Sequence, residues 1–227
     1  METAGQVVDQ VREVLEEVKP RLRGWLHAAT APLALAAGIV LVVLSPTAAT
    51  RTGSAIFAAS ALALFTVSAI MHRGRWSPRW NLFLRRLDHA SIFLLIAGSY
   101  TPFCLLLLEG SDRAIMLGVA WGGAALGIAF RIFWTHAPRW LYTPIYIALG
   151  WAAVLFAGDF ARNADTAVLV LLAVGGLLYT AGGVIYGLRR PNPFPQWFGF
   201  HEIFHTLTII AFVTHYVGVS LATYSLR

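Results

Sequence analysis

Two histidines four residues apart, His201 and His205, have the clearest potential for chemistry in this sequence. On a helix this spacing puts both imidazole rings on one face, about 40° apart around the axis and one turn apart along it, so both can reach one metal ion. A third imidazole, from His72, would leave a fourth position for water. Three protein ligands and one open position are typical of a catalytic zinc site.

Two more polar side chains belong with this set. Asp88 could be a direct ligand or could hold the water, and its negative charge would help to neutralise a divalent ion in an apolar place, where neutral clusters cost less to bury. Ser68 lies one turn before His72 on the same face and is placed to hydrogen-bond within the cluster. We therefore predict Asp88 and Ser68 as catalytic residues and four metal ligands, His72, His201, His205 and Asp88.

Zinc is the expected metal, but two histidines and one carboxylate also suit non-haem iron, so the sequence leaves iron as an alternative. A haem site has less support. His201 and His215 are fourteen residues apart and could face two stacked haems, but such a site needs the same pair on a second helix. No other apolar stretch supplies that pair.

The remaining histidines have simpler explanations. His89 points about 100° away from the neighbouring aspartate on a helix, so we expect it to bond a carbonyl group or a neighbouring helix. His27 is expected to be an interfacial cap at the start of an apolar stretch, and His136 to be solvated in a basic turn. His215 lies about 15 Å deeper than His205. It either faces a cavity or makes a polar contact between helices, and we favour the contact.

The sequence predicts seven membrane-spanning helices that position these groups. The chain has 227 residues, of which 58% are hydrophobic and 12% charged, whereas a soluble domain carries about twice that charged fraction. Each crossing takes about 20 apolar residues, which leaves no room for a separate soluble catalytic or DNA-binding domain. The expected spans are 26–45, 53–72, 87–108, 114–133, 139–157, 165–186 and 199–222. The predicted fold is an all-α membrane protein, a seven-transmembrane helix bundle with a short N-terminal amphipathic helix.

The basic residues indicate the orientation of this bundle. The net charge is +6, but the basic side chains are scattered at the ends of apolar stretches and do not gather on one face, so we expect no nucleic-acid partner. Thirteen of the 17 basic residues fall on one side of the predicted spans and four on the other. This excess predicts a cytoplasmic N-terminus and an outside C-terminus in the plasma membrane. All predicted ligands then lie near the cytoplasmic ends of their helices.

Residues 3–19 predict the amphipathic element. Val7, Val11, Leu15 and Val18 recur at helical spacing while charged residues fill the other face. Because the charge is mixed, an anchor for anionic lipid is disfavoured and a helix that packs on the bundle is favoured. The expected division is a cytoplasmic amphipathic helix and linker, residues 1–24, followed by the seven-helix transmembrane domain, residues 25–227.

Three segments carry a resemblance to a known family: Ser68–His72, Leu84–Pro102 and His201–His205. With these motifs the chain resembles the bacterial hemolysin III family, which is related to the progestin and adipoQ receptors. The resemblance implies a seven-helix bundle with a cytoplasmic N-terminus and a zinc ion near the cytoplasmic face. It also implies that the three histidines already named hold the zinc, that Asp88 contacts it through water and that Ser68 lies nearby.

The resemblance also bears on function. It implies kinship with eukaryotic receptors that have a ceramidase-like activity. It also implies membership of a wider superfamily of metal-dependent hydrolases in membranes. We expect a zinc-dependent hydrolase that acts on an amide or ester bond of a membrane lipid, with that lipid as the partner. The alternatives are a non-catalytic membrane sensor or receptor with a structural zinc, and a pore-forming hemolysin-like protein. The pore has little physical support, because the predicted intramembrane polar residues cluster at one end and do not line a path.

Overall fold

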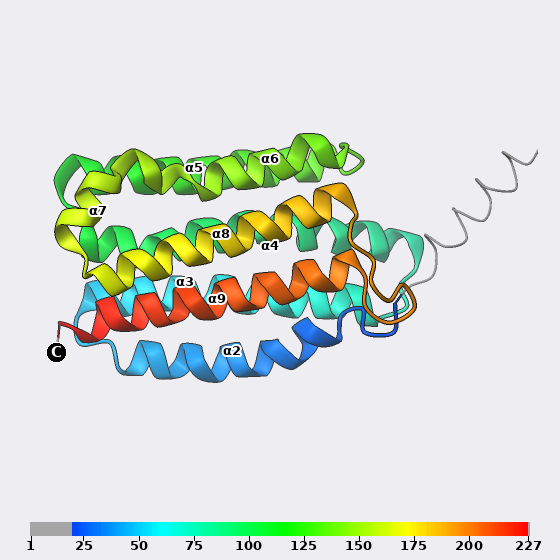
Figure 1. Ribbon diagram of the computed structural model, residues 1–227, viewed down its shortest axis with the longest axis horizontal. Helices are drawn as coiled ribbons and strands as arrows, with labels where there is room; N and C mark the ends of the chain where they lie inside the picture. The colour runs from blue at the N-terminus through cyan, green and yellow to red at the C-terminus, as the bar shows by residue number, and fades with distance from the viewer. Residues whose placement is uncertain (1–19, 227) are drawn as a thin grey trace, which may run out of the picture.

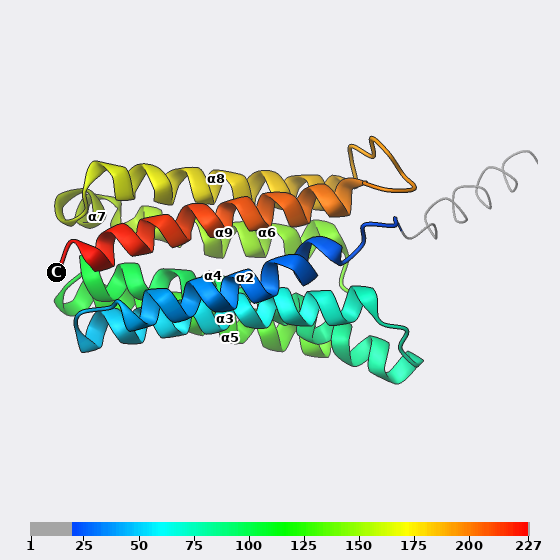
Figure 2. The same cartoon turned by 90° about the horizontal axis from the view of Figure 1, so that it is seen from below.

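The structure is a computed structural model that describes residues 20–226, which form a bundle of long helices lying side by side (Figure 1, Figure 2). The elements are α2 (Trp25–Val43), α3 (Ala48–Arg73), α4 (Pro78–Leu107), α5 (Gly110–Phe133), α6 (Arg139–Gly150), η1 (Ala152–Phe156), α7 (Ala157–Asn163), α8 (Thr166–Leu188) and α9 (Phe200–Tyr224). Within residues 20–226 the only β-pairing is an isolated bridge between Phe194 and Phe198. The amphipathic helix predicted over residues 3–19 lies outside the described residues.

Seven helical segments of residues 20–226 are long and apolar enough to cross a membrane, and the fifth of them comprises α6, η1 and α7 together. The all-α, seven-helix membrane bundle is therefore confirmed. The helix α4 is the central one, because 72% of its most apolar window is buried, against 17–44% for the other six spans. It packs against α3 on one side and α5 on the other.

The fifth span is broken, although the sequence predicted one continuous stretch over 139–157. The α-helical part ends at Gly150 and a short 3₁₀-helix follows. At the break, the Tyr100 hydroxyl of α4 donates to the carbonyl oxygens of Leu149, at 3.1 Å, and of Gly150, at 2.5 Å. An interrupted helix is tolerated in an apolar environment when other groups satisfy the freed backbone, and Tyr100 does so here.

The helix α4 is longer than the predicted stretch 87–108, because it begins at Pro78. Proline is favoured in the first turn of a helix, where its missing N–H has no intrahelical partner to lose. The search for an uninterrupted apolar stretch missed this extension, since three arginines and an asparagine interrupt its apolar residues over 78–86. Asp88 therefore lies well inside α4 and does not open it.

The segments that carry the predicted site residues meet at one end of the bundle. The turn between α3 and α4, the start of α2 and the loop before α9 all lie at the same end, on the right in Figure 2. The helices α3 and α4 approach closely there and along their length, because small residues form the contact. A Cβ atom on Gly98 would lie 2.1 Å from Ser60 Oγ, and one on Gly53 would lie 2.8 Å from Pro102 Cα. Small residues at such contacts are typical of helix packing in membranes.

The substitution Gly98→Ala should destabilise the bundle. Its new Cβ would force α3 and α4 apart, and overpacking of this kind costs about 1–3 kcal/mol. The matched control is Gly118→Ala in α5, where no atom lies within 4 Å of the added Cβ. Thermal unfolding of the purified variants in detergent should show a lower Tm for Gly98→Ala only. Equal melting temperatures would show that the α3–α4 contact is not tight.

Candidate metal centre

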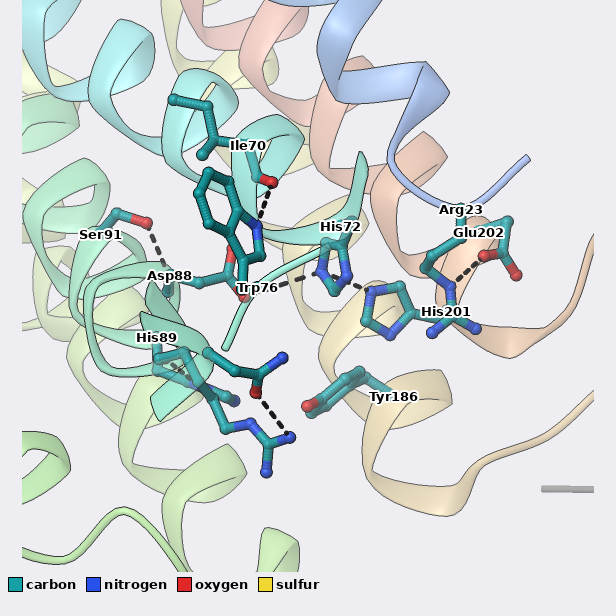
Figure 3. A network of polar contacts seen from close by, with 12 residues as sticks. Arg23, Ile70, His72, Trp76, Asp88, His89, Ser91, Tyr186, His201 and Glu202 are labelled. Carbon is teal, nitrogen blue, oxygen red and sulfur yellow. Dashed lines mark hydrogen bonds and ion pairs between the residues drawn. The ribbon is translucent and has the colours of Figure 1, made fainter. Parts of the chain in front are cut away.

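The three predicted histidine ligands converge at the end of the bundle. Candidate donor atoms of His72, His201 and His205 all lie within 4.8 Å of one another. The Nε2 atoms of His72 and His201 are 3.3 Å apart, and the ring centroids of His201 and His205 are separated by 4.4 Å. All three side chains are buried. Figure 3 shows His72 between Asp88 and His201.

This geometry fits a metal ion. Two nitrogen ligands bound at about 2.0–2.1 Å to one tetrahedral zinc ion would lie roughly 3.4 Å apart, close to the 3.3 Å between the two Nε2 atoms. Neutral imidazole nitrogens are donors that zinc and iron both accept. The residues therefore fit a divalent metal, and the donor set does not by itself select zinc.

Local structure explains why the ligands meet. His72 lies in the last turn of α3, while His201 and His205 lie in the first two turns of α9. Between the latter two, Glu202 turns away and its Oε2 accepts the backbone N–H of Gly199 at 2.9 Å, which caps α9. The cap fixes the first turn of the helix on which both histidines are carried.

Asp88 stands beside the three imidazoles and is not part of their close group. Its Oδ2 lies 3.8 Å from His72 Nε2. The Ser68 side chain is a hydrogen-bonding neighbour of the Asp88 carboxylate. Both predicted catalytic side chains thus lie at the site, with Ser68 beside Asp88.

One further histidine of this cluster was not predicted as part of the site. His27 was expected to be an interfacial cap, but it is 2% exposed and its ring stacks on that of His205, with centroids 3.7 Å apart and planes 7° from parallel. The edge of Phe65 packs against it at 5.1 Å. Neither His27 nitrogen has a hydrogen-bond partner within residues 20–226. The only available signal was that His27 lies at the same end of its span as the ligands.

The segment before α2 also packs against the ligands. Gly24 has φ +81°, and a Cβ atom there would lie 2.7 Å from the Cβ of His72. The Arg23 Nε donates to Glu202 Oε1 at 2.5 Å, joining this segment to the first turn of α9 (Figure 3). The Arg21 N–H donates to the carbonyl of Gln196 at 2.9 Å. The start of α2 therefore fixes the ends of α3 and α9 relative to each other.

The other histidines were predicted with mixed success. His89 Nδ1 lies 2.7 Å from the carbonyl oxygen of Arg85, as expected for a contact with a carbonyl, and His136 is exposed. His215 Nε2 lies 3.3 Å from the Leu172 carbonyl oxygen of α8, so the predicted contact between helices is confirmed. The sequence treated this contact and a place in a cavity wall as alternatives, but His215 has both.

A largely apolar cavity of about 290 Å³ begins at the metal centre. Asp88, His201 and His205 line one end of it. The walls come from α4, α8 and α9 and from all three parts of the broken fifth span, α6, η1 and α7. The break at Gly150 therefore shapes the cavity wall. A ligand in this cavity would have one end against the three imidazoles and the rest among apolar side chains.

Comparisons with known proteins show which proteins this chain is similar to. A family model described as "Haemolysin-III related" matches residues 15–216. The chain is 32% identical over 154 residues to "Hemolysin-3 homolog" of Bacillus subtilis (strain 168), which covers 68% of this chain and 69% of that protein. It is 30% identical over 186 residues to "Hemolysin-3" of Bacillus cereus, covering 81% and 82% of the two chains. It is also 30% identical over 151 residues to "Adiponectin receptor protein" of Drosophila melanogaster, covering 60% of this chain and 34% of that protein.

Removing a predicted ligand should remove the metal. We expect about one metal ion per purified chain, and a small fraction of that in His72→Ala, His201→Ala or His205→Ala, because each loses one of three donors. Elemental analysis of purified protein measures this directly. The control is His136→Ala, which changes an exposed histidine and should keep full occupancy. Full occupancy in all three ligand variants would disprove the site.

His27 should tune the metal affinity through the ring that it supports. In His27→Ala the His205 ring loses its stacking partner, and because such an aromatic contact is worth about 0.5–1.5 kcal/mol, the metal affinity should fall about two- to tenfold. In His27→Phe the stack is kept, so the affinity should stay close to that of the wild type. Competition with a chelator of known affinity gives both values. If His27→Ala binds as tightly as the wild type, the stack does not position His205.

Proposed function

The chain belongs to the haemolysin-III related family, and we propose that it is a zinc-dependent hydrolase that cleaves an amide or ester bond of a membrane lipid. The observation that carries the proposal is the position of three imidazoles and a carboxylate at one end of an apolar cavity. A metal with a purely structural role needs no such cavity. An apolar cavity that ends at a metal suits a lipid whose polar bond lies at the metal and whose chain lies along the walls.

Each side chain has a distinct part in this proposal. Zinc, when bound, polarises a carbonyl group and lowers the pKa of a water molecule toward about 7. His72, His201 and His205 would hold the ion through their ring nitrogens. The Asp88 carboxylate would take a proton from the attacking water and return it to the leaving group. Ser68 would keep that carboxylate oriented, and the apolar walls would hold the acyl chain and exclude other water.

The proposed place of the site is the headgroup level of the cytoplasmic leaflet of the plasma membrane. The helix α3 ends one residue after His72, and α9 begins one residue before His201, so the ligands lie where the spans end. The excess of basic residues on this side argues for the cytoplasmic face. Amide and ester bonds of membrane lipids lie at that depth, so the proposed substrate and the site would meet without leaving the bilayer.

A receptor without catalytic activity is the second candidate. Its support is the similarity to a protein named adiponectin receptor protein. In such a receptor the metal would be structural and the cavity would hold a ligand that is not cleaved. The two candidates share the metal and the cavity, and they differ in whether Asp88 is needed for chemistry.

Asp88→Asn should separate these candidates. The change removes the proton acceptor while three histidines remain to hold the metal, so we expect unchanged metal content and a fall in hydrolysis of about 10²–10⁴-fold, as for loss of a general base. The measurement is fatty-acid release from a panel of membrane lipids, with and without chelator. The control Asp165→Asn changes an exposed carboxylate and should retain both metal and activity.

Three results would count against the hydrolase. No release of fatty acid by the metal-loaded wild type from any lipid of the panel would favour the receptor. Release that chelator does not suppress would exclude a metal-dependent reaction. Equal rates in Asp88→Asn and wild type would remove Asp88 from the chemistry.

A further inference from the structure

The far end of the cavity carries polar atoms that nothing in the proposed reaction uses. Ser99 of α4, Tyr179 of α8 and His215 of α9 all line the cavity. The Ser99 Oγ, the Tyr179 hydroxyl and the His215 Nδ1 are buried and have no hydrogen-bond partner within residues 20–226. Buried polar atoms are nearly always paired. In a membrane interior the cost of an unpaired one is especially high.

Tyr179 and His215 are direct neighbours, and Ser99 lies one helical turn from a residue that packs on the histidine ring. The rings of Tyr179 and His215 are 5.5 Å apart. Phe103, one helical turn after Ser99, has its ring 6.1 Å from that of His215. Gly175 makes room for the histidine, because a Cβ atom there would lie 2.2 Å from the ring. Three helices therefore present polar atoms to the same region of a largely apolar cavity.

The unpaired atoms of these three side chains favour one kind of ligand group. His215 Nε2 faces the Leu172 carbonyl oxygen at 3.3 Å, so the proton of a neutral ring lies on Nε2 and Nδ1 is left as an acceptor. The hydroxyls of Ser99 and Tyr179 can donate or accept. A ligand hydroxyl matches this set, since it can donate to Nδ1 and accept from a hydroxyl. A ligand carbonyl oxygen cannot donate to Nδ1, and an unsubstituted chain satisfies none of the three atoms.

The distance to the metal centre defines where that hydroxyl must lie. His205 and His215 are ten residues apart on α9, which is about 15 Å along the helix axis. Between the two ends the wall is largely apolar and includes Ile92 and Ile96, and the Thr208 hydroxyl there donates to the Phe204 carbonyl at 2.9 Å. A ligand with its polar head at the three imidazoles would therefore reach the second polar group near the middle of a long chain.

We propose that the cavity binds long-chain acyl groups that carry a hydroxyl near the middle of the chain, and that Ser99, Tyr179 and His215 bind this hydroxyl. The position of the acyl head rests on the proposed hydrolase function. The second polar group itself rests on its own three side chains. It would select among acyl chains that the metal centre alone does not distinguish.

Competitive binding to the purified full-length protein tests this selectivity. A labelled unsubstituted long-chain fatty acid is displaced by acids of the same length that are unsubstituted, hydroxylated next to the carboxyl group, hydroxylated at mid-chain or oxidised to a ketone at mid-chain. One additional hydrogen bond in a buried site corresponds to about a three- to tenfold gain in affinity. We expect that gain for the mid-chain hydroxyl, and none for the hydroxyl beside the carboxyl group. The mid-chain ketone should bind more weakly than the mid-chain alcohol.

Substitutions in the cavity wall show which side chains bind the mid-chain hydroxyl. The readout is the ratio of the affinities for the mid-chain alcohol and the unsubstituted acid, so a general loss of binding or folding cancels. Tyr179→Phe and Ser99→Ala should each bring this ratio toward one. The matched control is Tyr216→Phe, because the Tyr216 hydroxyl donates to the Ala37 carbonyl at 3.0 Å and does not line the cavity. Its ratio should equal that of the wild type.

Several results would overturn the proposal. Equal affinity for the alcohol and the unsubstituted acid, an equal gain from a hydroxyl beside the carboxyl group, or no displacement by any acid would each do so. A ratio unchanged in both Tyr179→Phe and Ser99→Ala would also do so. Free fatty acids contain no bond for the hydrolase to cut, so the result is separate from catalysis. A preference for the mid-chain alcohol in a protein that hydrolyses no lipid would overturn the hydrolase and leave this binding group in place.

Discussion

The constraint on which this structure depends is the burial of three imidazole rings around a single point. Their donor atoms lie within 4.8 Å of one another at the ends of α3 and α9, in surroundings with little water. Grouped nitrogen donors in an apolar place are costly unless something satisfies them, and their spacing would let one divalent ion satisfy all three. The ends of two helices that are far apart in sequence must then be held in a fixed relation. Most of the polar contacts at this end of the bundle contribute to holding them.

The start of α2 supplies much of that support. Gly24 lies against His72, His27 stacks on His205, and Arg23 pairs with the glutamate that caps α9. The same organisation extends into the membrane, where Tyr100 satisfies the break in the fifth span and that break shapes one wall of the cavity. The same helices thus form the metal centre and the cavity. A lipid whose cleavable bond lies at the ion would have its acyl chain along α4, α8 and α9.

Much of this arrangement could be predicted because a membrane leaves few choices. A lipid environment requires helices of a given length, so apolar stretches reveal the spans, and the spacing of His201 and His205 reveals a shared face. What could not be predicted depends on contacts between distant segments. The break at Gly150 needs Tyr100 from another helix, and the role of His27 needs His205 from the far end of the chain. The beginning of α4 mixes arginines with apolar residues, so no continuous apolar stretch marks where the helix starts.

X-ray absorption at the zinc edge, recorded on the purified full-length protein, tests directly whether three histidines hold a zinc ion. We expect zinc with three imidazole nitrogens at about 2.0–2.1 Å and an oxygen as the fourth ligand. A spectrum of zinc surrounded by oxygen alone, or a protein that takes up no zinc under conditions where it stays folded, would contradict this expectation.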